Sequence, residues 1–383
     1  MKFLHLSDIH IGKSVNGFSM IDEQVNAFKQ ILDYAKIEEV QAVAIAGDIY
    51  DRAVPGIEAV RIFDDFLTEL AEQNVAVLLI SGNHDSPERL NFASRLLSDK
   101  NLYIHSVYQG VFEPVTLTDE FGEVNFWLLP FIKPATVRSF FPDTEIENYT
   151  DAVRAVMQSA QFNDSCRNIL VSHQFYLTSG IIPLRSESEI ESVGGLDAVD
   201  TDCLLPFDYI ALGHLHGSQR IGKETIRYAG SPIKYSFSET NQKKSINLIE
   251  IKEKGNVVIT HLPIIPIHDM LEIRGKFEEV LNYEMSSKVD SNDYLRITLI
   301  DDDEILDLME RIRKVYPNTM VLTFDNKRTQ INLAEVTADM ENAEKLSPFD
   351  LFCEFFLKTT GATLTSEQIE IVREMLDGEE IFK

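Results

Sequence analysis

Short apolar runs alternate with longer amphipathic segments over the first 80 residues of this chain. The runs at 2–6, 42–46 and 75–80 have the length of strands, and the segments near 20–39 and 57–73 have the length and apolar spacing of helices. Strands that alternate with helices usually pair into a largely parallel sheet with helices on its faces. This alternation is the strongest constraint on the fold, and it predicts an α/β protein.

The apolar pattern continues beyond residue 100 and predicts further strands. Gly and Pro separate short apolar runs over 102–130, and a helix is expected near 151–160. The remaining strands of this part are expected at 168–171, 209–212, 226–229, 245–251 and 257–262. The last three of them are expected to be antiparallel, and a turn at 253–256 joins the final two. The predicted architecture is an α/β sandwich of mixed sheets flanked by helices.

A change of pattern after Pro263 and Pro266 predicts a domain boundary. Beyond it, strands are expected at 271–274, 294–300 and 320–324, with a helix at 304–315. These elements predict a small α+β domain. A polar stretch and two capped helices follow and predict a helical tail. The expected domains are therefore 1–265, 266–336 and 337–383.

The charge of the chain bears on its partners. The 383 residues carry a formal net charge of −27. Proteins that hold DNA by charge alone are usually basic, so this balance taken alone argues against DNA. Bound dications that make a groove locally positive would reconcile the charge with nucleic acid. A partner that supplies the phosphate contacts would do the same.

The sequence predicts a cytoplasmic protein. His5 and Asp8 interrupt the N-terminal apolar residues before these could serve as a signal peptide, and no apolar run has the length of a membrane span. The cysteines are widely spaced and form no Cys-x-x-Cys pair, which disfavours a disulfide framework and a zinc site. They are Cys166, Cys203 and Cys353.

Five short polar segments each follow directly on a predicted strand. They are Asp8-Ile9-His10, Gly47-Asp48-Ile49-Tyr50-Asp51, Gly82-Asn83-His84-Asp85, Ser172-His173 and Gly213-His214-Leu215-His216. Loops at the carboxyl ends of strands in an open α/β sheet converge at one edge, so these segments can meet. Each segment alone is common in turns or on surfaces. All five in order, each at a strand end, predict a single site.

The five segments offer Asp, Asn and His side chains and no Cys. Oxygen ligands mixed with imidazole suit Mn²⁺, Fe²⁺ or Zn²⁺, and the lack of thiolate argues against structural zinc. Two ions held about 3.5–4 Å apart can clamp the attacking and leaving oxygens of a displacement at phosphorus. One carboxylate must then lie between the ions, and Asp48 is the natural bridge.

This ordered set resembles the signature of the calcineurin-like metallophosphoesterase family. The resemblance implies that one ion binds Asp8, His10, Asp48 and His216. It implies that the other ion binds Asp48, Asn83, His173 and His214. By the same resemblance His84 is not a ligand but faces the scissile phosphate, where it stabilises the transition state and protonates the leaving group. An imidazole that titrates near neutrality can supply that proton.

Asp51 and Asp85 have two interpretations. They could orient ligand or catalytic histidines, because such imidazoles commonly need a partner. They could equally cap a helix or stabilise a turn. The histidines outside the segments are expected to be packing or surface residues. They are His5, His105, His261 and His268.

The sequence around the segments is similar to the SbcD nuclease branch of the family, most sharply in residues 1–13, 47–52, 82–90 and 228–232. The similarity implies a manganese-dependent nuclease in DNA end processing, repair and recombination. Such a nuclease is a 3′-to-5′ exonuclease on double-stranded ends and an endonuclease on single strands or hairpins. The alternative within this class is a nucleotide or protein phosphatase. A DNA-tethering scaffold without activity is the rival from another class, and the complete ligand set disfavours it.

Basic residues near the segments are candidates for contacts to DNA phosphates. They are Lys13, Arg52, Arg89 and Lys234, with Lys243 and Lys244 as further candidates. Phosphate contacts carry no sequence information, which suits a nuclease that acts on ends. A solvated surface is the alternative for each of them. By the resemblance, the domain expected at 266–336 caps the DNA.

Apolar side chains crowd the two helices expected in the tail. They include Phe349, Phe352, Phe355, Phe356, Ile369 and Val372. So apolar a helix pair needs a surface to bury it, either on its own domain or on a partner. The resemblance implies the partner, since in the SbcD family this tail docks on the coiled-coil base of the SMC-like ATPase SbcC. It also implies a homodimer within a heterotetramer.

Overall fold

Side chains that alternate in direction along the strands build two packed sheets. In β4 (Ala42–Ala46), the three alanines lie in the core between the sheets, while Val43 and Ile45 lie in the core under the helices. Every residue of this strand is buried, as expected for a strand covered on both faces. The small alanine side chains let the two sheets approach each other.

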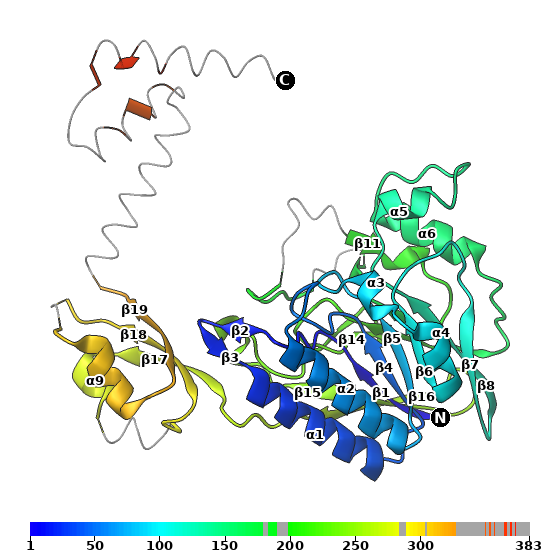
Figure 1. The fold of residues 1–383 in the computed structure, drawn as a ribbon, viewed down its shortest axis with the longest axis horizontal. Coiled ribbons are helices and arrows are strands. Elements are labelled where there is room, and N and C mark those ends of the chain that lie inside the picture. Colours follow the sequence, from blue (N-terminus) through cyan, green and yellow to red (C-terminus); the bar gives the residue numbers. More distant parts are fainter. Residues whose placement is uncertain are drawn as a thin grey trace. The chain divides into compact units, whose positions relative to one another are not determined.

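The first sheet has the strand order β16-β15-β1-β4-β5-β6 (Figure 1). Its parallel strands are β1 (Lys2–Leu6), β4, β5 (Ala76–Ile80) and β6 (Leu102–His105). Two antiparallel strands, β15 (Ser245–Ile251) and β16 (Val257–Pro263), extend it beyond β1. Its outer face is covered by α1 (Ile21–Ile37) and α2 (Ile57–Glu72).

The second sheet has the strand order β13-β14-β12-β9-β8-β7. Its central strands β8 (Gly122–Leu129), β9 (Arg167–Ser172), β12 (Tyr209–Leu212) and β14 (Lys223–Tyr228) are parallel. The edge strands β7 (Pro114–Asp119) and β13 (Gln219–Ile221) are antiparallel to their neighbours. The helices α5 (Pro134–Arg138) and α6 (Tyr149–Ser159) pack on its outer face.

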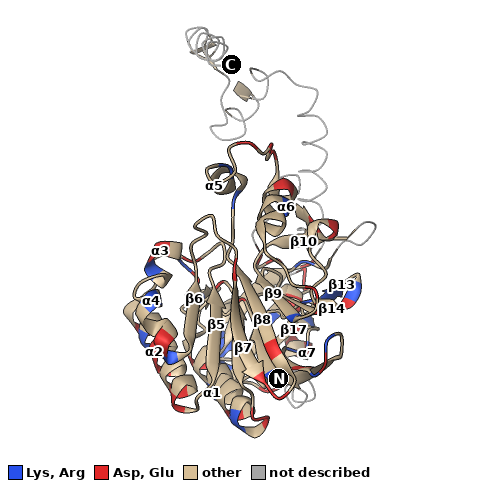
Figure 2. Ribbon diagram, turned by 90° about the vertical axis from the view of Figure 1, so that its right-hand side faces the viewer, with Lys and Arg blue, Asp and Glu red and all other residues tan. Residues whose placement is uncertain are grey.

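The computed structural model describes residues 1–178, 183–189, 198–282, 289–302 and 305–326, and in the tail residues 349, 352, 353, 356, 364, 365, 368, 369 and 372. Charged residues lie mainly on helices and loops, whereas β5 and β6 carry none (Figure 2). Among the described helices, none combines the length and apolar character that crossing a membrane requires.

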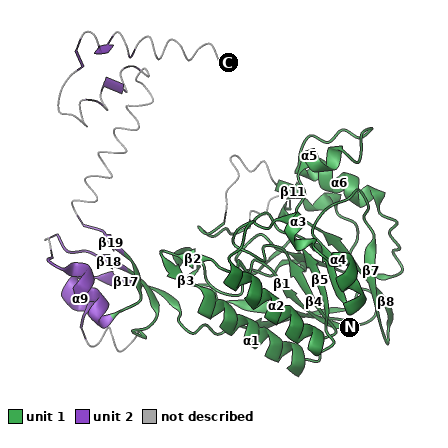
Figure 3. Cartoon of the chain, viewed as in Figure 1, with its two compact units in different colours: residues 1–272, 289–296, 316–321 green, residues 273–288, 297–315, 322–383 purple. Residues whose placement is uncertain are grey.

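The chain divides into two compact units (Figure 3). One comprises 1–272, 289–296 and 316–321, and the other 273–288, 297–315 and 322–383. A three-stranded sheet is formed by β17 (Met270–Gly275), β18 (Tyr294–Leu299) and β19 (Thr319–Phe324). The described part of the second unit includes the helices α7 (Phe277–Val280) and α9 (Leu308–Val315). The smaller elements of the first unit are β2 (Ser14–Val15), β3 (Phe18–Ser19), α3 (Pro87–Leu90), α4 (Ser94–Leu97), β10 (Phe175–Leu177) and β11 (Ala198–Asp200).

The predicted fold class is confirmed, with two local differences. The run at 226–229 belongs to β14, which lies in the second sheet, parallel to β12 and antiparallel to β13, and not beside β15. The helix expected at 304–315 begins at Leu308. The first difference arises because strand pairing is set by contacts distant in sequence, which the apolar pattern of one segment does not encode.

Candidate metal centre

All five predicted polar segments lie at the carboxyl ends of parallel strands. Asp8 and His10 follow β1, Asp48 follows β4, and Asn83 and His84 follow β5, all in the first sheet. His173 follows β9, and His214 and His216 follow β12, in the second sheet. Both sheets therefore contribute residues to the site, as expected for loops at carboxyl strand ends.

The backbone of four site residues is in the left-handed region. Their φ angles are 51° for Asp8, 47° for His10, 51° for Asp48 and 103° for His214. Non-glycine residues rarely adopt such angles, and they tend to do so at functional sites where the surrounding structure enforces them. Hydrogen bonds link two of the loops, because the Asp8 N–H donates to the Gly47 carbonyl at 3.1 Å and the His10 N–H to the Asp48 carbonyl at 3.0 Å.

One group of donors gathers around His10. The Nε2 atoms of His10 and His216 face each other at 3.1 Å. Ligand atoms of Asp8, His10 and His216 all lie within 4.8 Å of one another, and all three residues are buried. Asp48 Oδ2 lies 3.6 Å from His10 Nε2. Two facing imidazole nitrogens beside two carboxylates make a donor set that fits a divalent cation.

A second group of donors gathers around Asn83. Its Oδ1 atom lies 3.0 Å from His173 Nε2 and 3.1 Å from His214 Nδ1. Asp48 Oδ2 is 3.4 Å from His173 Nε2. The Nδ1–H of His173 donates to the Ala46 carbonyl at 2.7 Å, which leaves its Nε2 free to act as a ligand. This set also fits a divalent cation.

Asp48 lies between the two groups of donors. Burial alone would raise the pKa of its carboxyl, but the neighbouring His173 and His10 rings outweigh burial and hold that pKa well below its usual value. The carboxylate is therefore charged. Its Oδ1 accepts the backbone N–H of His84 at 2.9 Å, so Asp48 is fixed while Oδ2 faces histidines of both groups.

The other ionisable groups of the site respond to burial and to one another. Burial raises the pKa of Asp8 to about 7 and lowers the pKa of His214 to about 3. Burial would also lower the pKa of His173, but the charge and hydrogen bond of Asp48, together with Asp8 and the Ala46 carbonyl, outweigh burial and raise the pKa to about 9. A buried proton on His173 thus balances the carboxylates, and a divalent cation can take over that role.

His84 lies beside both donor groups. Its Nδ1–H donates to the Asp51 carbonyl at 3.0 Å, and its Nε2 is 4.0 Å from Asp48 Oδ2. The side chain is 17% exposed, so the ring reaches solvent while its Nε2 points towards the site. A partly buried orienting bond on one nitrogen and access on the other suit a group that gives a proton to a substrate.

The two aspartates with alternative interpretations differ in the structure. Asp85 accepts backbone N–H groups of Gly82 at 2.8 Å, Tyr50 at 3.0 Å and Ile49 at 3.2 Å, so its carboxylate ties two ligand loops together. The carboxylate of Asp51 instead accepts from Lys13 Nζ at 2.9 Å. Asp51 orients His84 through its backbone carbonyl only.

A buried hydrogen-bond system behind His216 was not predicted. Ser188 Oγ lies 2.7 Å from His216 Nδ1 and donates to Glu239 Oε1 at 2.6 Å. Burial would raise the pKa of Glu239, but Lys244, whose Nζ is 2.7 Å from Oε2, and His216 together outweigh burial and lower it. Glu189 accepts the His216 backbone N–H at 2.7 Å. These residues come from three distant segments, so no spacing in the sequence signals them.

The predicted phosphate-contact residues lie in different environments. Arg52 has a side chain that is 81% exposed, and Arg89 is exposed. Lys13 pairs with Asp51, and Lys234 donates to the Thr240 carbonyl and pairs with Asp269 at 2.7 Å. The prediction for Lys244 is wrong, because its side chain is buried and engaged with Glu239 and the His216 carbonyl.

One further cation, absent from the sequence predictions, lies near the site. The guanidinium of Arg185 stacks on the Phe175 ring at 3.8 Å, and that ring lies 5.9 Å from the His214 ring. Its charge contributes to the lowered pKa of His214 after burial and His173. The stacking holds a positive charge at the edge of the donor groups.

Of the predicted docking residues, Phe355 lies outside the described residues. Phe352 is 39% exposed, and Phe349, Phe356, Ile369 and Val372 are partly buried.

Three glycines leave room for the site. A Cβ on Gly82 would lie 2.0 Å from Asp48 Oδ1, and one on Gly213 would lie 2.0 Å from the Ala46 carbonyl. Gly47 has a φ of 82°, and a Cβ there would lie 2.5 Å from His173 Nδ1. Only glycine fits where the loops of the two sheets approach so closely.

Two mixed sheets flanked by helices, with buried Asp and His donors where their strands end, define a metallophosphoesterase. Residues 1–218 match the family model of calcineurin-like phosphoesterases, and the chain belongs to this family. Residues 266–360 match the model described as the Type 5 capsule protein repressor C-terminal domain.

Similar proteins indicate the branch of the family to which this chain is related. A protein named as the SbcD subunit of the nuclease SbcCD from Staphylococcus saprophyticus subsp. saprophyticus is 30% identical over 380 residues, which is 98% of this chain and 98% of that protein. Its namesake from Staphylococcus epidermidis is 31% identical over 84% of this chain and 85% of that protein. A solved dimetal phosphatase from Danio rerio is 12% identical and covers 70% of this chain and 97% of its own, with a TM-score of 0.40. Within its family, this chain is a homologue of the SbcD nuclease subunits, which confirms the predicted resemblance.

Proposed function

We propose that this protein is the nuclease subunit of an SbcCD-type complex and hydrolyses DNA phosphodiesters with two metal ions. It acts as a 3′-to-5′ exonuclease on double-stranded ends and as an endonuclease on single strands and hairpins. The observation that supports this most is the pair of donor groups around His10 and Asn83, with Asp48 between them and His84 beside them. The likeness to proteins named as nuclease subunits supports DNA as the substrate.

The donor set indicates which residues would hold the ions. Asp8, His10, Asp48 and His216 would hold one, and Asp48, Asn83, His173 and His214 the other. Mixed carboxylate, amide and imidazole donors without thiolate suit Mn²⁺, which is the proposed metal. When bound, such ions supply Lewis acidity at the phosphoryl oxygens and activate water.

The chain's own residues provide the remaining chemistry. His84 keeps a proton on Nδ1 through the Asp51 carbonyl, and its Nε2 is the atom that would transfer a proton to the leaving oxygen. Asp85 fixes the loops that carry Asp48 and Asn83 by accepting their neighbouring N–H groups. Both roles depend on side chains that are already positioned before substrate binds.

Contacts to DNA phosphates are assigned to exposed or site-facing cations. Arg52 and Arg89 are exposed, and Arg185 stacks on Phe175 near the donor groups. Lys13 and Lys234 remain candidates, but each must first exchange an aspartate partner for phosphate. Guanidinium groups suit this role, because they bind phosphate in a bidentate manner.

Each of the three predicted domains has its own role in the complex. Residues 1–265 form the nuclease domain, 266–336 cap the DNA, and 337–383 dock an SbcC-type SMC-like ATPase. Two such subunits form a homodimer within a heterotetramer, and the complex acts in the cytoplasm at the nucleoid. A chain ending at residue 336 should therefore retain metal binding and lose co-purification with the ATPase. Undiminished co-purification would remove the tail from this role.

The test of the activity uses end-labelled duplex and hairpin DNA with Mn²⁺, with and without the ATPase partner. We expect cleavage that stops when EDTA is added and falls by about 10²- to 10⁴-fold in His84→Ser, the loss typical for a removed proton donor. His105→Ser, at an exposed histidine outside the site, is the matched control. Turnover of nucleotides or phosphopeptides without any cleavage of DNA would replace the proposal with a phosphatase.

A further inference from the structure

The histidines of the two donor groups are supported in different ways. His173 donates its Nδ1–H to the Ala46 carbonyl, a fixed backbone group. His216 is supported instead by another side chain, because Ser188 Oγ lies 2.7 Å from its Nδ1. The support of His216 therefore depends on side chains that are replaceable one at a time, whereas that of His173 does not.

The hydrogen-bond directions around Ser188 follow from its partners. An ionised carboxylate can only accept, so the single hydroxyl proton of Ser188 is donated to Glu239 Oε1 at 2.6 Å. The serine oxygen must then accept from His216, which places a proton on Nδ1. The lone pair of His216 Nε2 consequently points to the place where His10 Nε2 also points, 3.1 Å away. The tautomer is the one that a metal ligand requires.

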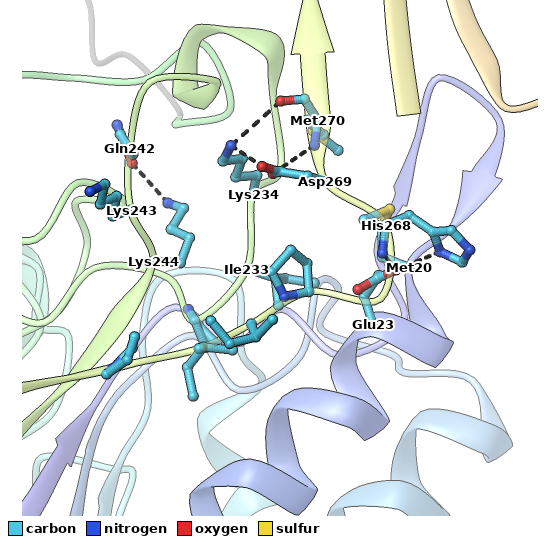
Figure 4. A pocket seen from close by; sticks show the side chains of 15 residues that line it. Met20, Glu23, Ile233, Lys234, Gln242, Lys243, Lys244, His268, Asp269 and Met270 are labelled. Carbon is cyan, nitrogen blue, oxygen red and sulfur yellow. Dashed lines mark hydrogen bonds and ion pairs between the residues drawn. The ribbon is translucent and has the colours of Figure 1, made fainter. Parts of the chain in front are cut away.

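Lys244 completes a closed system around His216. Its Nζ lies 2.7 Å from Glu239 Oε2 and donates to the His216 carbonyl at 2.9 Å. It also donates to Ser231 Oγ at 2.9 Å and to Gln242 Oε1 at 2.8 Å, the latter bond being drawn in Figure 4. Glu239 is completely buried, and the Lys244 ammonium beside it balances its carboxylate.

We infer that Glu239, acting through Ser188 and charge-balanced by Lys244, positions His216 and sets the affinity of one of the two metal sites. The affected site is the one formed with Asp8 and His10. Glu239, Ser188 and Lys244 are positioning residues, since none of them lies in a donor group. This inference rests on the two-metal site of the proposed function and adds an asymmetry between the two ions.

The test compares Ser188→Ala with Ser188→Thr in Mn²⁺ titrations of the full chain. Removal of the hydroxyl should weaken one of the two binding events by about 10-fold, the lower end for a lost outer-shell partner, and leave the other unchanged. Threonine retains the hydroxyl and should restore the affinity. Electron paramagnetic resonance supplies a second readout: at limiting Mn²⁺, Ser188→Ala should show isolated ions where the wild type shows a coupled pair.

A matched control and a second variant make the outcome decisive. Ser106→Ala removes a buried hydroxyl that donates to the Pro87 carbonyl, away from the donor groups, and should bind both ions like the wild type. Glu239→Gln combined with Lys244→Met removes both buried charges together. Methionine is unbranched and similar in volume to lysine but carries no charge, so it fits beside the cavity of about 220 Å³ that Lys244 borders (Figure 4). The double variant should reproduce the loss at one site.

Two results would overturn the inference. Equal binding of both ions by Ser188→Ala and wild type would show that the relay does not set affinity. Equal weakening in Ser188→Ala and Ser188→Thr would assign the effect to packing. The proposed function fails in a different way, because a wild-type chain that binds two ions but cuts no DNA would refute the nuclease while leaving the relay testable.

Discussion

Left-handed backbone at Asp8, His10 and Asp48 brings their carboxylates and imidazole to one point. Such angles cost roughly 1–3 kcal/mol each, and the surrounding hydrogen bonds must compensate for them. The N–H groups that bond to Gly47 and Asp48 carbonyls provide part of that compensation. These hydrogen bonds therefore hold the ligand loops in position before any ion binds, so little rearrangement is needed on binding.

Gly82→Ala tests how tightly the ligand loops pack. The new Cβ would lie 2.0 Å from Asp48 Oδ1 and 2.4 Å from Asp48 N, so Asp48 must move. We expect a loss of about 1–3 kcal/mol in unfolding free energy and a fall in bound Mn²⁺. Denaturant titration and metal analysis measure the two effects. At Gly56 no heavy atom lies within 4 Å of an added Cβ, so Gly56→Ala should leave metal content unchanged. A fully metallated Gly82→Ala would contradict this packing.

His5 should make the stability of the fold sensitive to acid. Burial lowers its pKa from 6.5 to about 3. The folded state then binds fewer protons than the unfolded state below pH 6.5, so stability is complete above that pH and falls as pH decreases. At pH 5 the loss from this one group is about 2 kcal/mol.

The measurement is the unfolding free energy of wild type and His5→Gln in EDTA at pH 7 and pH 5. Because glutamine does not titrate, the variant should lose about 2 kcal/mol less than the wild type over this interval. The two proteins share all other ionisable groups, so the difference isolates His5. Parallel pH dependences would show that His5 keeps an ordinary pKa.

The sequence predicted the residues of the site more readily than the residues that hold them in position. The polar side chains of Asp8, Asp48 and His173 stand out because each follows an apolar strand, which is a local signal. Ser188 and Glu239 are 51 residues apart; Ser188 lies in a turn, and Glu239 lies in a short 3₁₀ helix, Phe237–Glu239. Their contact joins two segments distant in sequence, and no local rule encodes it.

Among the elements, β4 has the central position. Its inner face meets the second sheet through alanine side chains alone, and its carboxyl end carries Asp48. The same strand supplies the Ala46 carbonyl that orients His173 on β9. The spacing between the sheets therefore sets the distance between ligands that come from different sheets.

Ala44→Leu should disturb stability and the site together. Ala44 is completely buried between the sheets, and a larger side chain would force them apart at a cost of about 1–3 kcal/mol. We expect weaker Mn²⁺ binding as well, since Asp48 and His173 would separate. Ala71→Leu, at an exposed position of α2, is the matched control and should change neither quantity. Calorimetric Mn²⁺ titration and denaturant unfolding report both. Destabilisation with unchanged Mn²⁺ affinity would show that sheet spacing does not control the site.

Strand existence was predicted well, and so was the antiparallel pairing of β15 with β16, whereas the neighbours of β14 were not. The runs that became β4 and β12 were predicted correctly because a short apolar run that ends at a Gly-containing segment is a local pattern. The placement of β14 beside β12 arises from pairing between segments on different parts of the chain.

At the scale of the whole molecule, the net charge of −27 would limit how this chain holds DNA, its proposed substrate. Arg52, Arg89 and Arg185 are the cations best placed for phosphates. Each phosphate contact contributes about −0.9 to the slope of log affinity against log salt, so three contacts give a slope of about −3. A basic DNA-binding protein with many contacts would have a much steeper dependence.

Fluorescence anisotropy with duplex DNA in Ca²⁺, which should occupy the site without supporting cleavage, tests this expectation. We expect weak binding by the chain alone, a slope of about −3, and a slope shallower by about 1 in Arg185→Gln. Glu224 pairs with Arg220 on an exposed edge strand, so Arg220→Gln serves as the control cation. A slope near −10 in the wild type would require a basic surface that these residues do not provide.

The pairing of β1 with β15 determines when the first sheet can be completed during synthesis of the chain. Lys2 is opposite Glu250, so the first strand of the chain obtains one of its neighbours only after nearly 250 residues have left the ribosome. The last ligands, His214 and His216, emerge shortly before it. Contacts so distant in sequence form late, because long loops must close first. A growing chain therefore cannot assemble both donor groups until synthesis has passed His216, and β1 gains its β15 neighbour later still.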